Sequence, residues 1–153
     1  MVSVLGRAHG INITRYDHAF IVLDDYTAME PWPSGARLTQ LEDFDENPVA
    51  HVWMPALDDA ARQRVTHAAR ALDGATYRAR DFHVITSWRR GRRGRRVCRA
   101  ISDARRLPPG RFVAEAYRQA GVPLFGGRPD VTVGDLAALT VTVNGWDQRV
   151  YYP

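Results

Sequence analysis

The sequence predicts one α+β domain over residues 1–153, in which a small antiparallel sheet or partial barrel packs against two or three helices. Two segments carry apolar residues at helical spacing, and about six short segments carry the apolar runs or alternation of β-strands. A length of 153 residues fits one domain, and a hydrophobic content of 45% with four tryptophans is that of a folded chain. Strands and helices in separate runs are typical of the α+β class.

Strand signals dominate the first third of the chain. Residues 18–23, HAFIVL, are nearly continuous in apolar side chains, which is the pattern of a strand buried on both faces. Residues 26–30 are expected to return as its hairpin partner, and the prolines of the following PWPSGAR stretch predict a turn. Residues 37–41 and 49–54 are predicted as two more strands on either side of an acidic turn, and residues 11–14 could form another.

Two helices are predicted with both ends marked. Asp58 is a good N-cap, since its carboxylate can accept from the free amides of the first turn, and Gly74 marks the end of that helix. In the second helix, Pro108 and Pro109 suit a first turn that does not need their missing amides, and Gly121 can adopt the left-handed conformation of a helix end. The apolar faces consist of Ala61, Val65, Ala68, Ala69 and Leu72 in the first helix and Phe112, Val113, Ala116, Tyr117 and Ala120 in the second.

The remaining segments carry weaker signals. Residues 75–87 are predicted as a loop that could include a short helix, and residues 88–96, WRRGRRGRR, are predicted as an exposed loop because they are too charged and too glycine-rich to pack. Residues 97–101 could form a strand or a helical turn. Residues 139–152 alternate around an Asn-Gly pair that suits a type I′ turn, which predicts a β-hairpin.

Several short motifs follow one another in a definite order. RYDHAFIVLDD spans residues 15–25, AMEPWPSGARLTQLEDF spans residues 28–44, and ARALDGATYRARDF spans residues 69–82. Within residues 107–139, a helix that opens abruptly after a loop is followed by AGVPL and VTVGDL. Together these stretches resemble the permuted NlpC/P60 branch of papain-like cysteine hydrolases, in which the catalytic histidine precedes the nucleophile. The resemblance covers roughly residues 15–139 and implies a papain-like fold.

The resemblance implies a role for several residues. It matches His18 to the family's catalytic histidine and Glu30 to the glutamate of an E-A-x-P-x-G motif that follows it. The nucleophile of the family begins a helix in a Cys-Ser-(Glu/Gln)-Leu-Val signature. Placed without gaps on the Phe-Val pair of this helix, the signature puts its serine on Gly110 and its cysteine on Pro109. Members that keep the cysteine are hydrolases or acyltransferases acting on peptide, amide or ester bonds, including bacterial cell-wall peptides and lipids.

Proline at the nucleophile position closes the acyl-enzyme route. A papain-like cysteine lies at a helix N-terminus because free amides and the helix dipole stabilise its thiolate and the oxyanion. Pro109 has neither a nucleophile nor an amide, Gly110 has no hydroxyl, and Arg111 stays protonated. We therefore expect a pseudoenzyme that binds an unknown protein or peptide-like ligand through the former cleft. The resemblance makes Arg111, Trp32 and Tyr77 the candidate ligand-binding residues.

An active enzyme would need another thiol, and Cys98 is the only cysteine. It lies beside Arg95, Arg96 and Arg99, whose positive charges would favour a thiolate at an exposed position. With His18 as the base, this arrangement predicts a thiol-dependent peptidase or amidase. In the alternative interpretation, Cys98 is a small buried hydrophobic residue of the VCRAI segment.

The arginine-rich stretch supports a third interpretation, a binder of nucleic acid or of an anionic surface. Arginine contacts phosphates and tryptophan can stack on a base, although the stretch could equally be a solvated insertion. All 21 basic residues are arginine, a bias typical of GC-rich coding sequences of bacteria or their phages, so a pI near 9.7 says little about partners by itself. The candidate residues are Trp88, Arg89, Arg90, Arg92, Arg93, Arg95 and Arg96.

Composition argues against several other classes. The five histidines have no close metal-ligand spacing, so we expect neither a metal nor another cofactor. One cysteine excludes an intramolecular disulfide framework. No apolar run approaches the roughly 18 residues of a membrane span, and the N-terminal stretch lacks a basic region followed by an apolar one. We therefore expect a cytoplasmic protein without a membrane span.

Overall fold

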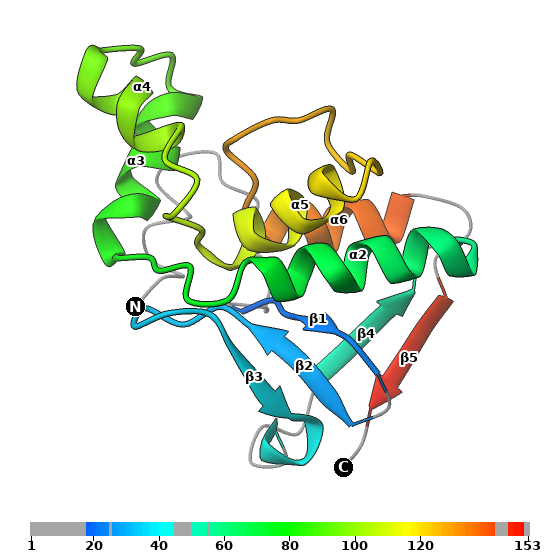
Figure 1. The fold of residues 1–153 in the computed structure, drawn as a ribbon. Coiled ribbons are helices and arrows are strands. Elements are labelled where there is room, and N and C mark those ends of the chain that lie inside the picture. The colour runs from blue at the N-terminus through cyan, green and yellow to red at the C-terminus, as the bar shows by residue number, and fades with distance from the viewer. Residues whose placement is uncertain (1–17, 25, 45–49, 55, 143–146, 152–153) are drawn as a thin grey trace.

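The computed structural model describes residues 18–24, 26–44, 50–54, 56–142 and 147–151, whose arrangement is shown in Figure 1. Within these residues the fold is α+β, as predicted. The elements in chain order are β1 (Ile21–Val22), β2 (Thr27–Glu30), β3 (Arg37–Gln40), the 3₁₀ helix η1 (Leu41–Phe44), β4 (Ala50–Met54), α2 (Asp59–Ala71), α3 (Ala79–Arg89), α4 (Arg95–Ile101), α5 (Pro109–Gln119), α6 (Val133–Thr142) and β5 (Asp147–Tyr151).

β2 is the centre of a three-stranded antiparallel sheet, with β1 on one side and β3 on the other. Met29 of β2 is buried in the core, and Glu30, the last residue of the strand, lies opposite Arg37 of β3. Asp24 shapes the turn between β1 and β2 because its carboxylate accepts from the amide of Thr27 at 2.7 Å. β4 and β5 pair with each other as a separate two-stranded sheet.

Both helices whose ends are marked in the sequence are present, and they form the main layer over the three-stranded sheet. α2 packs against β1 and α5, as Figure 1 shows. Asp58 caps α2 by accepting from the amide of Ala61 at 2.6 Å, and Gly121 follows α5 with a φ of +79°. Phe112 is fully buried, which stabilises the fold by about 1.5–3 kcal/mol. The core consists of Ile21, Met29, Ala36, Val65, Ala68, Ala69, Leu72, Leu107, Phe112, Val113, Ala116, Tyr117 and Ala120.

Backbone hydrogen bonds connect the turn after β2 to the segment that leads into α5. Ala36, between β2 and β3, donates to the carbonyl of Ala75 and accepts from the amide of Gly74, both at 2.8 Å. One residue further along the chain, the carbonyl of Thr76 accepts from the amide of Leu107 at 2.9 Å. α5 begins two residues later. The end of β2 and the first turn of α5 are therefore held on the same side of the molecule.

The first turn of α5 is closely packed. Pro108 and Pro109 are fully buried, and a Cβ placed on Gly110 would lie 2.3 Å from the carbonyl carbon of Thr132. Real Cβ atoms do not approach other atoms this closely, so only glycine allows α5 to contact the backbone that leads into α6.

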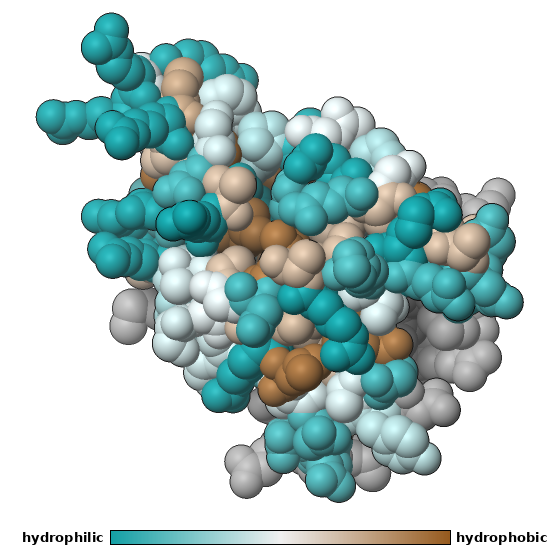
Figure 2. Space-filling view, in the orientation of Figure 1, coloured by the Kyte–Doolittle hydropathy of each residue, from teal (hydrophilic) through white to brown (hydrophobic). Residues whose placement is uncertain are grey.

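α3 and α4 pack on each other and form an arm that projects from the body of the molecule (Figure 1). We call residues 79–101 the arm. Figure 2 shows mainly hydrophilic side chains over it. The packing of α3 and α4 on each other stabilises both helices, because this arginine- and glycine-rich stretch does not carry apolar side chains at helical spacing.

The prediction of an exposed loop over residues 88–96 is corrected by the structure. Trp88 and Arg89 complete α3, and Arg95 and Arg96 begin α4, so only the turn between them is non-helical. The segment over residues 97–101, expected as either a strand or a helical turn, belongs to α4.

Other predicted elements also differ from the structure. Within the described residues there are five α-helices, not two or three. The strand expected over residues 18–23 is limited to β1, and Val22 is exposed because one face of the sheet is open. The hairpin predicted over residues 139–152 is wrong. Its first strand is predicted to include residues 139–142, but these residues complete α6, and β5 pairs with β4 instead. The strand proposed at residues 11–14 and the Asn-Gly turn at residues 144–145 lie outside the described residues.

α6 is helical because its first turn is capped. The hydroxyl of Thr132 accepts from the amide of Asp135 at 3.2 Å, and the carboxylate of Asp135 accepts from the amide of Thr132 at 2.8 Å. This reciprocal arrangement is a capping box, which outweighs the β-branched residues that follow in the helix.

Candidate functional site

The structure brings His18 and Glu30 together. His18 precedes β1 and Glu30 ends β2, and the Nε2 of His18 lies 3.1 Å from the Oε1 of Glu30. The Nε2 atom is buried but is not aligned with an acceptor as a hydrogen bond requires, so the contact is mainly electrostatic. The His18 side chain as a whole is 32% exposed, so part of the ring remains open to solvent.

Glu30 is a buried carboxylate with several neighbouring donors. Its residue is only 5% exposed, and the hydroxyl of Thr39 donates to its Oε2 at 2.9 Å. Burial by itself raises the pKa of this carboxyl group, but the adjacent His18 and the donors of Trp32 and Thr39 outweigh it and hold the pKa below the ordinary value of 4.5. Glu30 is therefore ionised at neutral pH.

Thr39 is a member of this site that the motifs of the sequence do not single out. The alternation in the β3 sequence RLTQ is the signal that identifies it, since Thr39 is the one buried residue of that strand. A buried hydroxyl needs a hydrogen-bond partner, and the Glu30 carboxylate supplies it.

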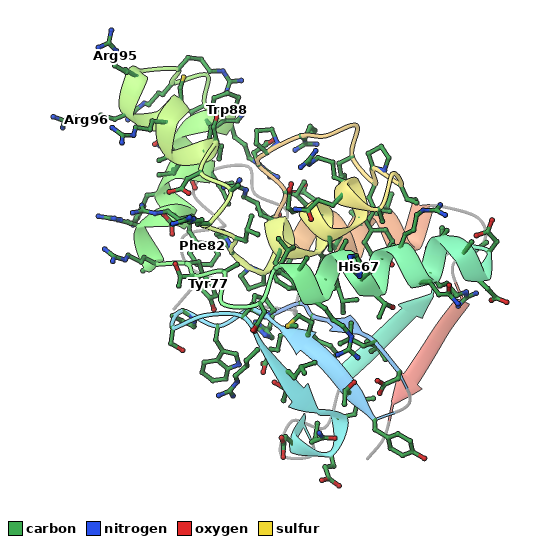
Figure 3. All side chains as sticks on the ribbon, viewed as in Figure 1. His67, Tyr77, Phe82, Trp88, Arg95 and Arg96 are labelled. Carbon is green, nitrogen blue, oxygen red and sulfur yellow. The ribbon has the colours of Figure 1, made fainter. Side chains whose placement is uncertain are left out.

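Two of the three predicted ligand-binding residues lie near this pair. Trp32 is exposed and follows β2 closely, and the guanidinium of Arg37 lies 4.4 Å from the centroid of its ring. Tyr77 is half-buried and makes an edge-to-face contact with Phe82, with the ring centroids 6.0 Å apart (Figure 3). Burial raises the pKa of Tyr77, and the negative charge of Glu30 adds to this effect, so the Tyr77 hydroxyl remains a donor.

The third predicted ligand-binding residue, Arg111, takes no part in this group. It lines a pocket between α5 and residues 123–129. Within the part of the chain that the structure describes, it makes no hydrogen bond or ion pair with His18 or Glu30.

Pro109 is the first residue of α5 and is fully buried. Because proline lacks an amide hydrogen, the first turn of α5 has one donor fewer than a helix that opens with another residue. The position that the resemblance assigns to the nucleophile therefore has no thiol, no amide and no exposed surface. The backbone hydrogen bonds that reach Leu107 hold this position on the side of the molecule where β2 ends.

Cys98 lies on α4, in the arm. Its thiol is within hydrogen-bonding distance of the carbonyl oxygen of Arg93, with the Sγ and the oxygen 3.1 Å apart. In Figure 1, α4 lies at the far end of the arm, whereas β1 and β2 lie in the body of the molecule. The structure therefore does not bring Cys98 to His18.

Arg89 has a structural role, and its assignment as an anion-binding residue is corrected. Its side chain is 15% exposed, and its Nε lies 3.1 Å from a carboxylate oxygen of Asp130. Its Nη2 donates to the carboxylate of Asp135 and to the backbone carbonyl of Asp130. These acceptors occupy the guanidinium, and they attach α3 to the segment that precedes α6.

The other candidate arginines of the arm are on its surface. The guanidinium of Arg93 lies 3.6 Å from the centroid of the Trp88 ring, so one face of that ring is already covered by a cation–π contact. Figure 3 shows Arg95 and Arg96 pointing away from the body of the molecule. The exposed candidates are Arg90, Arg92, Arg93, Arg95 and Arg96.

The described residues hold neither a clustered metal site nor a membrane-spanning helix. In that part of the chain, no three or more His, Cys, Asp and Glu side chains gather as a metal site would require. None of the described helices combines the length and apolar character needed to cross a membrane.

Comparison with protein-family models, with curated proteins and with solved structures finds no match to this chain.

The pH dependence of stability tests the environment of Glu30. Because the pKa of Glu30 is lower in the folded chain than in the unfolded chain, its stabilising effect is complete above about pH 4.5 and is lost as the pH falls through the folded-state pKa. Glu30→Gln should therefore make the free energy of unfolding, measured with urea, less sensitive to acid than in the wild type.

Two substitutions at Thr39 provide the matched comparison. Thr39→Val removes a donor to Glu30 and so brings the folded-state pKa closer to the unfolded value; the acid-induced loss of stability should be smaller and should be complete at a higher pH, whereas Thr39→Ser keeps the hydroxyl and the wild-type profile. The same acid dependence in the wild type and in Glu30→Gln would contradict this account.

Proposed function

We propose that the chain is a catalytically inactive papain-like protein of the NlpC/P60 type, which binds a protein or peptide-like ligand at the rim of the former active site. The observation that carries the proposal is a buried proline at the start of α5, on the side of the molecule where His18 and Glu30 meet. The base and its orienting carboxylate are kept, while the nucleophile position cannot react.

The pairing of His18 with Glu30 supports the family assignment. A papain-like site needs a histidine on a strand and a polar residue that orients its ring. Here His18 lies just before β1, Glu30 ends the neighbouring antiparallel strand β2, and Thr39 from β3 donates to the carboxylate. Burying a carboxylate costs free energy unless hydrogen-bond donors replace the lost water. The hydroxyl of Thr39 is such a donor to Glu30.

Two adjacent positions support the loss of catalysis. Proline 109 removes both the thiol and the amide that would serve the oxyanion, and its side chain is fully buried. At Gly110, where the family signature has serine, any Cβ would collide with the backbone of Thr132. The packing between α5 and α6 therefore excludes the family signature at this position, so reversal of a single substitution would not rebuild it.

The exposed groups around the pair suit a peptide-like ligand. The open part of the His18 ring offers a polar contact, and the exposed Trp32 ring with Arg37 stacked on it offers a flat apolar surface and donors. Tyr77 adds a hydroxyl donor. Aromatic and arginine side chains of this kind form the strongest contacts of protein interfaces.

Hydrolysis assays separate this proposal from the thiol-hydrolase alternative. The wild-type chain should not hydrolyse alanine p-nitroanilide faster than buffer does, because this amide needs an activated nucleophile and neither His18 nor the start of α5 has one beside it. Cys98→Ala should be indistinguishable from the wild type. Hydrolysis that is lost in both Cys98→Ala and His18→Gln would contradict the proposal and establish the thiol enzyme.

The charge distribution favours nucleic-acid binding as a second candidate function, located in the arm. Residues 82–102 contain seven of the 21 arginines and none of the 17 acidic residues, so this segment carries +7 whereas the rest of the chain carries −3. A bias towards arginine in the coding sequence would spread the charge over the whole chain. The segregation instead concentrates the positive potential on one projecting element.

Nucleic acid suits this surface better than a lipid bilayer does. Arginine forks match phosphate oxygens, and Arg92, Arg95 and Arg96 are exposed and have no ion pair within the described part of the chain. Membrane-surface helices also need a large apolar face. The exposed large hydrophobic residues that the structure describes are Val22, Tyr26, Trp32 and Leu38, and none of them is in the arm.

Neutralising three arm arginines should weaken nucleic-acid binding. We expect Arg92→Gln, Arg95→Gln and Arg96→Gln, combined in one protein, to reduce affinity for a short fluorescein-labelled DNA duplex, measured by fluorescence anisotropy. The slope of log affinity against log salt should decrease by about 0.9 for each phosphate contact that is lost.

A control with the same change of charge uses exposed arginines outside the arm. Arg37→Gln, Arg62→Gln and Arg105→Gln in one protein should leave the salt slope close to that of the wild type. Equal losses in the two triple variants would contradict a binding site in the arm. So would binding to phosphatidylserine vesicles by a wild-type protein that does not bind the duplex.

A further inference from the structure

A pocket of about 220 Å³ lies beside α5, between that helix, the end of α4 and residues 123–129. It opens on the side of α5 that carries Arg111, Glu115 and Arg118, whereas the core stripe of the helix faces α2 and the sheet. Arg128, from the loop after α5, contributes a third guanidinium. The pocket thus combines three cationic groups with one carboxylate in a small volume.

Two of the three guanidinium groups already have carboxylate partners. Arg118 donates to both oxygens of Glu115, at 2.8 and 2.6 Å. Arg128 donates to both oxygens of Asp130, at 3.2 and 3.0 Å. Forked pairs of this kind satisfy the charge and the geometry of both partners. Neither arginine is therefore left with an unmatched charge.

Arg111 is different. Within the described part of the chain, no acceptor lies within hydrogen-bonding or ion-pair distance of its guanidinium, and its residue is half-buried. The nearby Glu115 is occupied by Arg118 and also accepts from Gln119 at 2.8 Å. Burial lowers the pKa of Arg111, and the more distant charges of Glu115 and other carboxylates only partly oppose this effect. A half-buried guanidinium with five donors and no acceptor favours an anion that enters the pocket.

Part of the remaining lining of the pocket is apolar. Ile101, from the end of α4, is buried, and Leu124 and Phe125 line the pocket from the loop after α5. An occupant therefore needs a single anionic group at one end and an apolar body at the other. A planar carboxylate matches one arginine fork, whereas a phosphate dianion would require more than one uncommitted cation.

We propose that this pocket binds a small organic carboxylate, with its carboxylate on Arg111 and its apolar body against Leu124 and Phe125. The site does not depend on the proposed function of His18 and Glu30, because it uses the side of α5 that does not face the core. A volume of about 220 Å³ restricts the ligand to a small molecule and excludes a folded partner.

An NMR titration with benzoate, benzamide and inorganic phosphate tests the ligand class. Benzoate should shift the amide resonances of Arg111, Leu124 and Phe125 together and in a saturable manner. Benzamide has the same shape without the charge and should cause no saturable shift. Phosphate should bind at least about tenfold more weakly than benzoate, since one free guanidinium cannot match two charges. Equal responses to benzoate and benzamide, or tighter binding of phosphate, would overturn the proposal.

Substitutions of Arg111 test its role in binding against a structural role. Arg111→Met keeps an apolar stem and should weaken benzoate binding by about tenfold or more. Its thermal unfolding temperature should equal or exceed that of the wild type, because the substitution removes a partly buried charge that has no partner. Arg111→Lys should also bind benzoate more weakly, since an ammonium cannot form the fork.

Arg105→Met, at an exposed arginine outside the pocket, is the matched control and should bind benzoate as the wild type does. Unchanged benzoate binding in Arg111→Met, or a lowered unfolding temperature in that variant, would show that Arg111 does not serve as the anion site.

Discussion

The close contact between the first turn of α5 and the backbone that precedes α6 is the constraint on which the rest of the structure depends. Gly110 lies where no Cβ can be accommodated, and the prolines before it are fully buried. Because α5 packs on α2 and its leading segment is hydrogen-bonded to Thr76, this contact also fixes how the helices lie over the sheet. A larger residue at position 110 would separate α5 from α6 and disturb the core around Phe112.

The same constraint shapes the chemistry at the end of β2. His18 and Glu30 form a close pair at the sheet, and Thr39 of β3 donates to the carboxylate, so the pair does not need a nucleophile to persist. The first turn of α5, which would supply a thiolate and amides in a papain-like enzyme, is instead a packed hydrophobic contact formed by Pro109. The first turn of α5 is thus part of the packed interior, while the polar contacts of Glu30 with His18 and Thr39 are made at the sheet.

Local signals in the sequence predict the two central helices and the pairing of β1 with β2, because caps, prolines and glycines act on their own neighbours. Asp58 and Gly121 are where those signals place them. The arm could not be predicted in this way. Arg89 is buried by carboxylates 41 and 46 residues away, a contact that no local pattern encodes. The sequence contains Thr132 and Asp135, which form the capping box of α6. The β-branched residues near the end of this helix nevertheless favour a strand when tertiary packing is ignored.

The central claim is the proposal that position 109 corresponds to the nucleophile position of a papain-like site, within reach of His18. Its most direct test is the titration of a thiol placed there, in Pro109→Cys combined with Cys98→Ala, followed by the ultraviolet absorbance of the thiolate. The account predicts that this thiol ionises well below the ordinary cysteine pKa of about 8.5, and that His18→Gln abolishes the shift. A thiol that titrates at or above the ordinary value, with or without His18, would contradict it.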